Sequence, residues 1–221
     1  MIKAVFFDLD GTVSDTLNSI AYFGNNALKC NGFSEIDAKE YRYFAGNGRV
    51  ILVHRMLKFL GIDSEENYNK VANKYDEEYE KNPMLHTKTF DGMIKTLKNL
   101  KEKGLKLAVL SNKPDNVTQM VIEKMYGGLF DCVYGKKDSI LPKPDPQGAK
   151  QIAEELGVLT TECVMVGDTD VDILTAKNAD MKSIGVLWGF RDENELKSCG
   201  ADYICKKPTE ILDIISKIEN E

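Results

Sequence analysis

An apolar run that ends in two carboxylates constrains this sequence most. Val5-Phe6-Phe7 leads directly into Asp8-Leu9-Asp10-Gly11-Thr12. A near-continuous apolar run is typical of a parallel strand covered on both faces, and open α/β sheets bind ligands beyond the carboxyl ends of such strands. Two acids at spacing i, i+2 repel each other unless a cation, a proton or a phosphoryl group lies between them. The stretch therefore predicts a buried strand with a ligand site at its end, the alternative being two turn residues.

Composition excludes several classes of protein. The chain has 221 residues, 43% hydrophobic and 29% charged, which is enough for one substantial core with a smaller insert. A net charge of −6 argues against a nucleic-acid partner. With no apolar run of about 18 residues and no signal-peptide pattern, we expect a cytoplasmic protein without a membrane partner. The scattered cysteines and two histidines lack the spacing of a disulfide framework, a zinc site or a nucleophile.

The residues after the first stretch are predicted to form helices without a strand. Ser34 and Ser64 can cap helix starts, Asn31-Gly32 stops the first helix, and Pro83 ends the last. The predicted helices span 17–30, 34–43, 49–60 and 64–81. Such a block predicts an all-α cap at 16–86, inserted into a core made of 1–15 plus 87–221.

From Phe90 onward, strands and helices alternate regularly. The predicted strands are 105–110, 131–134, 163–166, 183–187 and 203–205, and the predicted helices are 93–103, 114–125, 146–156, 171–179, 193–198 and from 209 onward. Alternating units of this kind form a parallel sheet with helices on both faces. We therefore predict an α/β fold, a doubly wound, Rossmann-like parallel sheet that carries the inserted helical cap domain.

Two later segments carry polar groups that suit a phosphoryl ligand. Ser111-Asn112-Lys113 follows the strand predicted at 105–110, and its hydroxyl can donate to a phosphoryl oxygen; an ordinary loop or helix cap is the alternative. Lys143 lies between two prolines that restrict the backbone. A lysine held in this way suits a fixed contact to phosphate, the alternative being a solvated surface turn.

The segment around Asp168 repeats the pattern of the opening stretch around Asp8. The apolar strand predicted at 163–166 ends in Gly167-Asp168, with Asp170 and Asp172 close behind. The last two could simply favour the positive end of the following helix. Asp168, directly after the glycine, is a second hard oxygen ligand beside Asp8. Carboxylates without histidine or thiolate are the chemistry of Mg²⁺ rather than zinc.

All four segments resemble, in identity and order, the motifs of the haloacid dehalogenase superfamily of phosphotransferases, whose first cap type is a helical insert between the first two motifs. The resemblance implies that Asp8 is the nucleophile and Asp10 the general acid and base, with Lys143 as the third catalytic residue. It implies Mg²⁺ as the cofactor, held by Asp8, Asp10, Asp168 and Asp172. It implies a phosphate-binding set of Gly11, Thr12, Ser111, Asn112 and Lys143.

The cap segment around Asn47 narrows the expected substrate. Phe44-Ala45-Gly46-Asn47-Gly48-Arg49 looks like the substrate-specificity loop of phosphoglycolate phosphatases, which implies substrate contacts from Asn47, Gly48 and Arg49. We expect a Mg²⁺-dependent phosphatase, monomeric or homodimeric, that hydrolyses a small phosphate monoester through an aspartyl phosphate. A pyrophosphatase, nucleotidase or sugar-phosphate phosphatase of the same superfamily is the alternative. A non-enzymatic phosphate-sensing module is disfavoured, because Ser111 stands where a receiver would carry its acceptor aspartate.

Overall fold

The structure, a computed structural model, describes residues 1–220 as two compact units. The core unit contains residues 1–15 together with the chain from residue 89 onward, and the helical unit contains residues 16–88. None of the helices in residues 1–220 combines the length and the apolar character that a membrane crossing requires.

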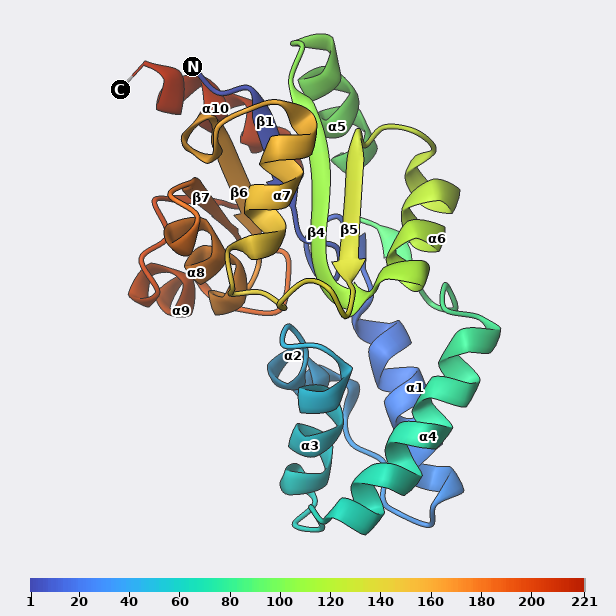
Figure 1. Cartoon of the computed structure of the whole chain (residues 1–221). Coiled ribbons are helices and arrows are strands. Elements are labelled where there is room, and N and C mark those ends of the chain that lie inside the picture. The colour runs from blue at the N-terminus through green and yellow to red at the C-terminus, as the bar shows by residue number, and fades with distance from the viewer. Residues whose placement is uncertain (221) are drawn as a thin grey trace. The chain divides into compact units, whose positions relative to one another are not determined.

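A six-stranded parallel sheet forms the centre of the core unit (Figure 1). Its strands, in the order β5-β4-β1-β6-β7-β8, are Cys132–Lys136, Lys106–Pro114, Ala4–Phe7, Cys163–Gly167, Lys182–Val186 and Tyr203–Cys205. Every residue of β1 and β6 is buried, which explains why both read as continuous apolar runs. The predicted doubly wound parallel sheet is confirmed, with β1 between β4 and β6. A second sheet has two short strands, β2 (Ser14–Asp15) and β3 (Lys88–Thr89).

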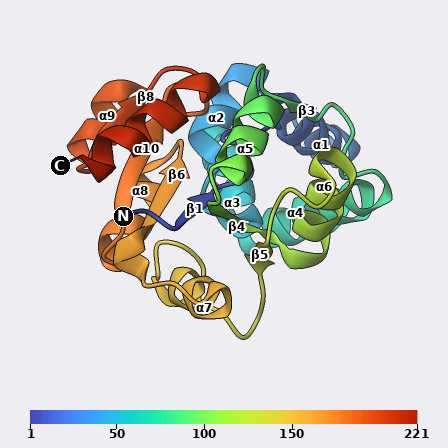
Figure 2. The same ribbon diagram turned by 90° about the horizontal axis from the view of Figure 1, so that it is seen from above.

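Helices cover both faces of this sheet (Figures 1 and 2). They are α5 Met93–Glu102, α6 Asp115–Tyr126, α7 Gln147–Leu156, α8 Asp170–Asn178, α9 Glu193–Ser198 and α10 Ile211–Glu219, with short 3₁₀ turns at Thr160–Glu162 and Pro208–Glu210. Alternate strand residues such as Phe6 and Met165 pack against Ile152 of α7 and Ala176 of α8 in one buried cluster. Helices α5 and α10 lie on the opposite face. The sheet is therefore buried on both sides, and ligands can reach it only at its edges.

Strand β4 extends beyond the position that the sequence predicts. The prediction ends the strand at residue 110, whereas β4 continues to Pro114, so Ser111-Asn112-Lys113 belongs to the strand and not to a loop. The pairing with β5 changes register between Leu110 and Pro114, and Pro114 then pairs with Lys136. Residues 111–113 are buried in this irregular stretch although their composition is polar.

The helical unit contains α1 Leu17–Cys30, a 3₁₀ turn Ala38–Glu40, α2 Tyr41–Phe44, α3 Arg49–Phe59 and α4 Glu65–Lys81. Ser64 caps α4 as predicted, since its hydroxyl accepts a hydrogen bond from Asn67 N. The helix predicted at 34–43 is wrong in its first half. The side chain of Asn25 in α1 bonds both Ile36 N and Ile36 O at 2.8 Å and holds that segment out of helical geometry. The short helix begins only after Asp37, whose carboxylate accepts from Lys39 N.

Candidate active site

Segments far apart in the sequence meet at the carboxyl edge of the core sheet. Asp8 follows β1, Ser111 lies in the extension of β4, and Asp168 follows β6. Because these three strands are parallel neighbours, their carboxyl ends lie at the same edge. Asp172 joins them from the first turn of α8, and Lys143 joins them from the segment before α7.

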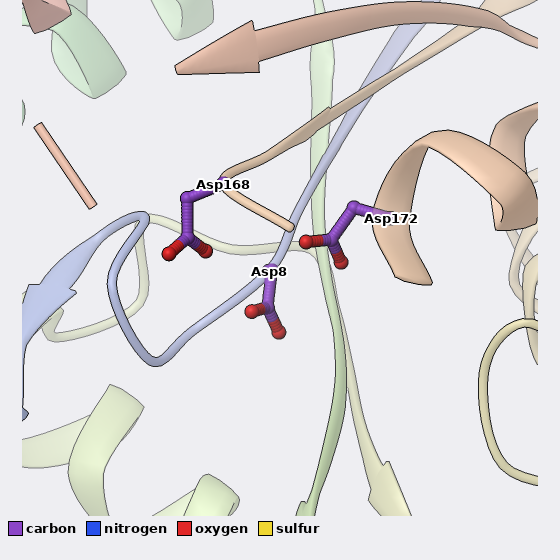
Figure 3. A group of neighbouring side chains, drawn as sticks. All are labelled: Asp8, Asp168 and Asp172. Carbon is purple, nitrogen blue, oxygen red and sulfur yellow. The ribbon is translucent and has the colours of Figure 1, made fainter. Parts of the chain in front are cut away.

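Three buried aspartates form the centre of this site (Figure 3). Carboxylate oxygens of Asp8, Asp168 and Asp172 all lie within 4.8 Å of one another, and the three residues are at most 6% exposed. Burial raises the pKa of Asp8 to about 7, Lys143 opposes this shift, and the neighbouring Asp172 adds to it. Burial and the charges of Asp172 and Asp8 raise the pKa of Asp168 well above its usual range. We call Asp8, Asp168 and Asp172 the acidic trio.

Lys143 supplies the positive charge next to the acidic trio. Its Nζ lies 2.8 Å from Asp8 Oδ1 and 2.6 Å from Asp172 Oδ1, and 2% of its side chain is exposed. Burial disfavours the charged ammonium, but the attraction of Asp172 and Asp8 outweighs burial and raises the pKa of Lys143. Lys143 therefore remains a cation at the edge of the sheet, in contact with the residue predicted to be the nucleophile.

Asp168 is held by hydrogen bonds to both of its oxygens. Thr12 Oγ1 donates to Asp168 Oδ1 at 2.9 Å, and Phe190 N donates to Asp168 Oδ2 at 2.7 Å. Gly11, with φ of 85°, lies so close to the Asp168 carboxylate that a Cβ at this position would collide with it. The hydroxyl of Thr12, predicted to bind phosphate, thus orients a member of the acidic trio.

Asp172 combines the two roles that the sequence left open. Its Oδ2 accepts from Thr169 N at 3.0 Å and from Thr169 Oγ1 at 2.8 Å, which caps α8. Its Oδ1 faces the site and contacts Lys143. One carboxylate therefore terminates a helix and contributes a charge to the acidic trio.

The polar residues at the end of β4 position their neighbours. Asn112 bonds the backbone of Lys143 at both ends of its amide: Lys143 N donates to Oδ1 at 2.8 Å, and Nδ2 donates to Lys143 O at 3.1 Å. Asn112, predicted to bind phosphate, therefore contributes the backbone placement of Lys143. Ser111 is buried at the same edge, and its Oγ accepts from Lys113 N at 3.3 Å.

Asp10 is not a member of the acidic trio, although its charge acts on Asp8, and its partner was not predicted from the sequence. Lys113 Nζ donates to Asp10 Oδ1 at 2.8 Å and to Asp10 Oδ2 at 3.0 Å. The place of Asp10 in the metal-binding set stays a prediction. A lysine directly after Ser111-Asn112, at the end of a buried strand, is the only sequence signal for this contact.

The predicted cap residues belong to the helical unit. Gly48, with φ of 82°, precedes the first residue of α3, which is Arg49. The Arg49 guanidinium donates to Tyr68 OH at 3.0 Å and lies 3.1 Å from Asp76 Oδ2, so it links the start of α3 to α4. The contacts of Asn47, Gly48 and Arg49 with a substrate stay predictions.

The acidic trio fits a magnesium ion. Its potential ligands are carboxylate oxygens, which Mg²⁺ prefers, without the imidazole or thiolate that zinc favours. Three acids within a few ångströms in a buried site also repel one another, and a single nearby lysine offsets only part of that charge. A divalent cation among these oxygens would balance the remainder.

Comparison with known proteins agrees with this geometry. Residues 5–186 match the family model described as haloacid dehalogenase-like hydrolase. The phosphoglycolate phosphatase of Aquifex aeolicus is 31% identical and 97% of each chain is covered, and that of Vibrio vulnificus is 29% identical with 97% of this chain and 96% of the relative covered. The crystal structure of a protein from Lactobacillus delbrueckii subsp. bulgaricus superposes on this chain with a TM-score of 0.93 at 32% sequence identity. The superposition covers 96% of this chain and 98% of the other. The match extends from the first strand to β7, and the chain therefore belongs to the haloacid dehalogenase-like hydrolase family.

Proposed function

We propose that this protein is a Mg²⁺-dependent phosphatase that hydrolyses a small phosphate monoester through an aspartyl-phosphate intermediate. The observation that carries the proposal is the buried contact between Asp8 and Lys143 beside Asp168 and Asp172, at the carboxyl edge of the sheet. An enzyme of this chemistry needs a carboxylate nucleophile, a fixed cation and oxygen ligands for a metal in one place. Relatives named phosphoglycolate phosphatase support the phosphatase activity in this proposal.

In the first step an oxygen of ionised Asp8 attacks phosphorus, the bond from phosphorus to the ester oxygen breaks, and Asp10 gives its proton to the leaving oxygen. In the second step water attacks the aspartyl phosphate and gives a proton to the Asp10 carboxylate. The bond from phosphorus to the Asp8 oxygen breaks, so inorganic phosphate leaves and the Asp8 carboxylate is regenerated. Lys143 and the hydroxyl of Ser111 stabilise the phosphoryl oxygens. Mg²⁺ bound by the acidic trio would offset the negative charge of the transferring group.

We propose 2-phosphoglycolate as the substrate. The names of the relatives and the Gly46-Asn47-Gly48-Arg49 segment support this choice. A small substrate offers only its phosphoryl group to the core residues, so its carboxylate needs a cation from elsewhere. Arg49 can bind a carboxylate with two parallel hydrogen bonds.

The test is a phosphate-release screen with purified protein and Mg²⁺ over 2-phosphoglycolate, pyrophosphate, nucleoside monophosphates and sugar phosphates. We expect kcat/KM to be largest for 2-phosphoglycolate. A larger value for pyrophosphate, a nucleotide or a sugar phosphate would replace the substrate and leave the reaction class unchanged. No phosphate release from any of these compounds would overturn the proposed function.

A further inference from the structure

Lys113 is a second buried lysine at the same edge of the sheet, and the mechanism above assigns it nothing. Its Nζ lies 2.8 and 3.0 Å from the two carboxylate oxygens of Asp10, the proposed general acid and base. The side chain of Lys113 is 7% exposed and that of Asp10 is 18% exposed. The two residues are 103 positions apart in the chain, so this contact depends on the fold.

The backbone on the lysine side of this contact is held in place. Thr118 Oγ1 donates to Lys113 O at 3.2 Å, and Lys113 N donates to Ser111 Oγ. Strand β5 approaches so closely at Gly135 that a Cβ there would lie 2.7 Å from Lys113 O and 2.5 Å from the Cα of Asp115. Lys113 therefore extends from a part of β4 that has little room to move.

The aspartate side is equally constrained. Gly11 N donates to Ser14 O at 2.8 Å, and Asp10 and Ser14 form an isolated β-bridge, so the turn that carries Asp10 is closed on itself. One ammonium that reaches both oxygens of a carboxylate also restricts rotation of that group, because a quarter turn would move one oxygen away. The position and the orientation of the Asp10 carboxylate are thus both specified.

A buried ion pair is a poor device for stability, because removing two charges from water offsets most of their attraction. Where the carboxylate must transfer protons, a fixed orientation has a direct use, since proton transfer requires an oxygen within hydrogen-bond reach of the reacting atom.

We propose that Lys113 is the positioning residue for the general acid and base, holding the Asp10 carboxylate in the orientation that proton transfer requires in both steps. The inference rests on the proposed function. The lysine does not touch the phosphoryl group in this role and acts only through Asp10. Loss of Lys113 should therefore slow a step strongly when that step needs a proton from Asp10 and weakly when it does not.

Aryl phosphates separate this role from a general structural one. Phenyl phosphate and p-nitrophenyl phosphate have similar shapes, but phenolate is a poor leaving group that needs a proton, whereas p-nitrophenolate leaves without one. In a two-step reaction kcat/KM reports the step that releases the alcohol. Misplacing Asp10 should therefore lower kcat/KM for phenyl phosphate far more than for p-nitrophenyl phosphate.

The experiment compares Lys113→Met, Lys113→Ala and the control Lys101→Met with wild type. Lys101 also contacts a carboxylate in the core unit, Asp131 at 2.6 Å, but it lies on the surface away from the site. We expect Lys113→Met to lower kcat/KM for phenyl phosphate about 100-fold and for p-nitrophenyl phosphate by less than about tenfold. Added ethylammonium should partly restore Lys113→Ala, and an equal concentration of ethanol should not. Lys101→Met should stay within about twofold of wild type on both esters.

Equal losses on the two aryl esters, or no loss, would overturn the role of Lys113 and leave the proposed function intact. If circular dichroism shows that Lys113→Met is unfolded, the test rests on folded Lys113→Ala. In that variant, failure of ethylammonium to raise kcat/KM for phenyl phosphate more than for p-nitrophenyl phosphate would also overturn the role of Lys113. A wild-type protein that releases phosphate from no ester at all would overturn the proposed function and this inference together.

Discussion

Lys143 and Lys74 each contact two carboxylates, but they differ in how far they are buried. Lys143 contacts two members of the acidic trio in the core unit, and 2% of its side chain is exposed. Lys74 in α4 of the helical unit lies 3.0 Å from Glu77 Oε2 and 2.7 Å from Glu78 Oε1, and 27% of its side chain is exposed. The distances are nearly the same, so the difference between the two clusters lies in their access to water.

The comparison shows that the same pKa direction can have different origins. The pKa of Lys74 is raised by the hydrogen bonds that its ammonium donates to Glu78 and Glu77, while the lysine remains in water. The pKa of Lys143 is raised against burial, by the attraction of Asp172 and Asp8. Water replaces a lost partner on α4, whereas nothing replaces it at the carboxyl edge of the sheet. Substitutions should therefore have large effects in the core unit and small ones on α4.

The largest effect is expected for Asp8→Asn. The amide keeps the shape of the side chain but cannot attack phosphorus, so kcat for 2-phosphoglycolate should fall at least about 10⁴-fold. Phosphate release and circular dichroism measure activity and folding on the same sample. A folded variant with activity within about tenfold of wild type would end the covalent mechanism.

Chelation should abolish activity, and Mg²⁺ should restore it.

Mg²⁺ should also change the stability of the protein in a way that depends on pH. Burial raises the pKa of Asp8 to about 7, from 3.8 in the absence of the fold. Between these two pH values the metal-free folded state therefore holds a proton that the unfolded state has released. The contribution of Asp8 to stability therefore falls as pH rises from about 4 to about 7. Because Mg²⁺ binds the ionised acids, it should raise Tm more at pH 7 than at pH 5.

Thermal melts with EDTA or Mg²⁺ at both pH values measure this difference, and Asp168→Asn serves as the control that loses it. Full activity in exhaustively chelated protein would contradict the metal site. So would rescue by Zn²⁺ without rescue by Mg²⁺.

A large effect on both stability and activity is expected for Lys143→Met. The substitution leaves two buried carboxylates without their cation, which should lower the free energy of unfolding by about 3 to 5 kcal/mol at neutral pH. It should also lower kcat about 10²- to 10³-fold, since a fixed positive charge near the phosphoryl group is lost. Urea unfolding measures the first effect and phosphate release the second. A stability change as small as that of the α4 variant below would refute the contrast between buried and exposed clusters.

A smaller and more selective effect is expected for Arg49→Ala. If Arg49 binds the carboxylate of 2-phosphoglycolate, kcat/KM should fall about 30-fold or more for this ester and much less for p-nitrophenyl phosphate, which lacks the carboxylate. Asp76→Asn, which removes the ion pair of Arg49 with Asp76 and keeps its hydrogen bond to Tyr68, is the matched control. Equal losses of both esters in Arg49→Ala would assign Arg49 to the packing of α3 on α4.

The smallest effect is expected for Lys74→Met. Glu77 and Glu78 also contact Lys81, and all of these side chains reach water, so Tm should shift by at most about 2 °C. Differential scanning fluorimetry at low and physiological salt measures it. A shift as large as that of Lys143→Met would show that the α4 cluster is more than a solvated helix face.

Local patterns predicted most elements of the fold because their causes act within a few residues. The apolar runs of β1 and β6 predicted buried parallel strands, and the Ser64 cap predicted the start of α4. The helix expected at 34–43 failed for a reason that is not local. Asn25, on a helix that precedes it, captures the backbone of Ile36.

A short window of sequence was enough to select the candidate site residues at the strand ends, because a carboxylate after a buried strand is a local pattern. The partner of each of these residues became visible only in the folded chain. Thr12 orients Asp168, Asn112 holds the backbone of Lys143, and Lys113 holds Asp10. The physical reason is that these pairs join segments brought together by strand order and register, and side chains meet across a parallel sheet only after every strand has taken its place.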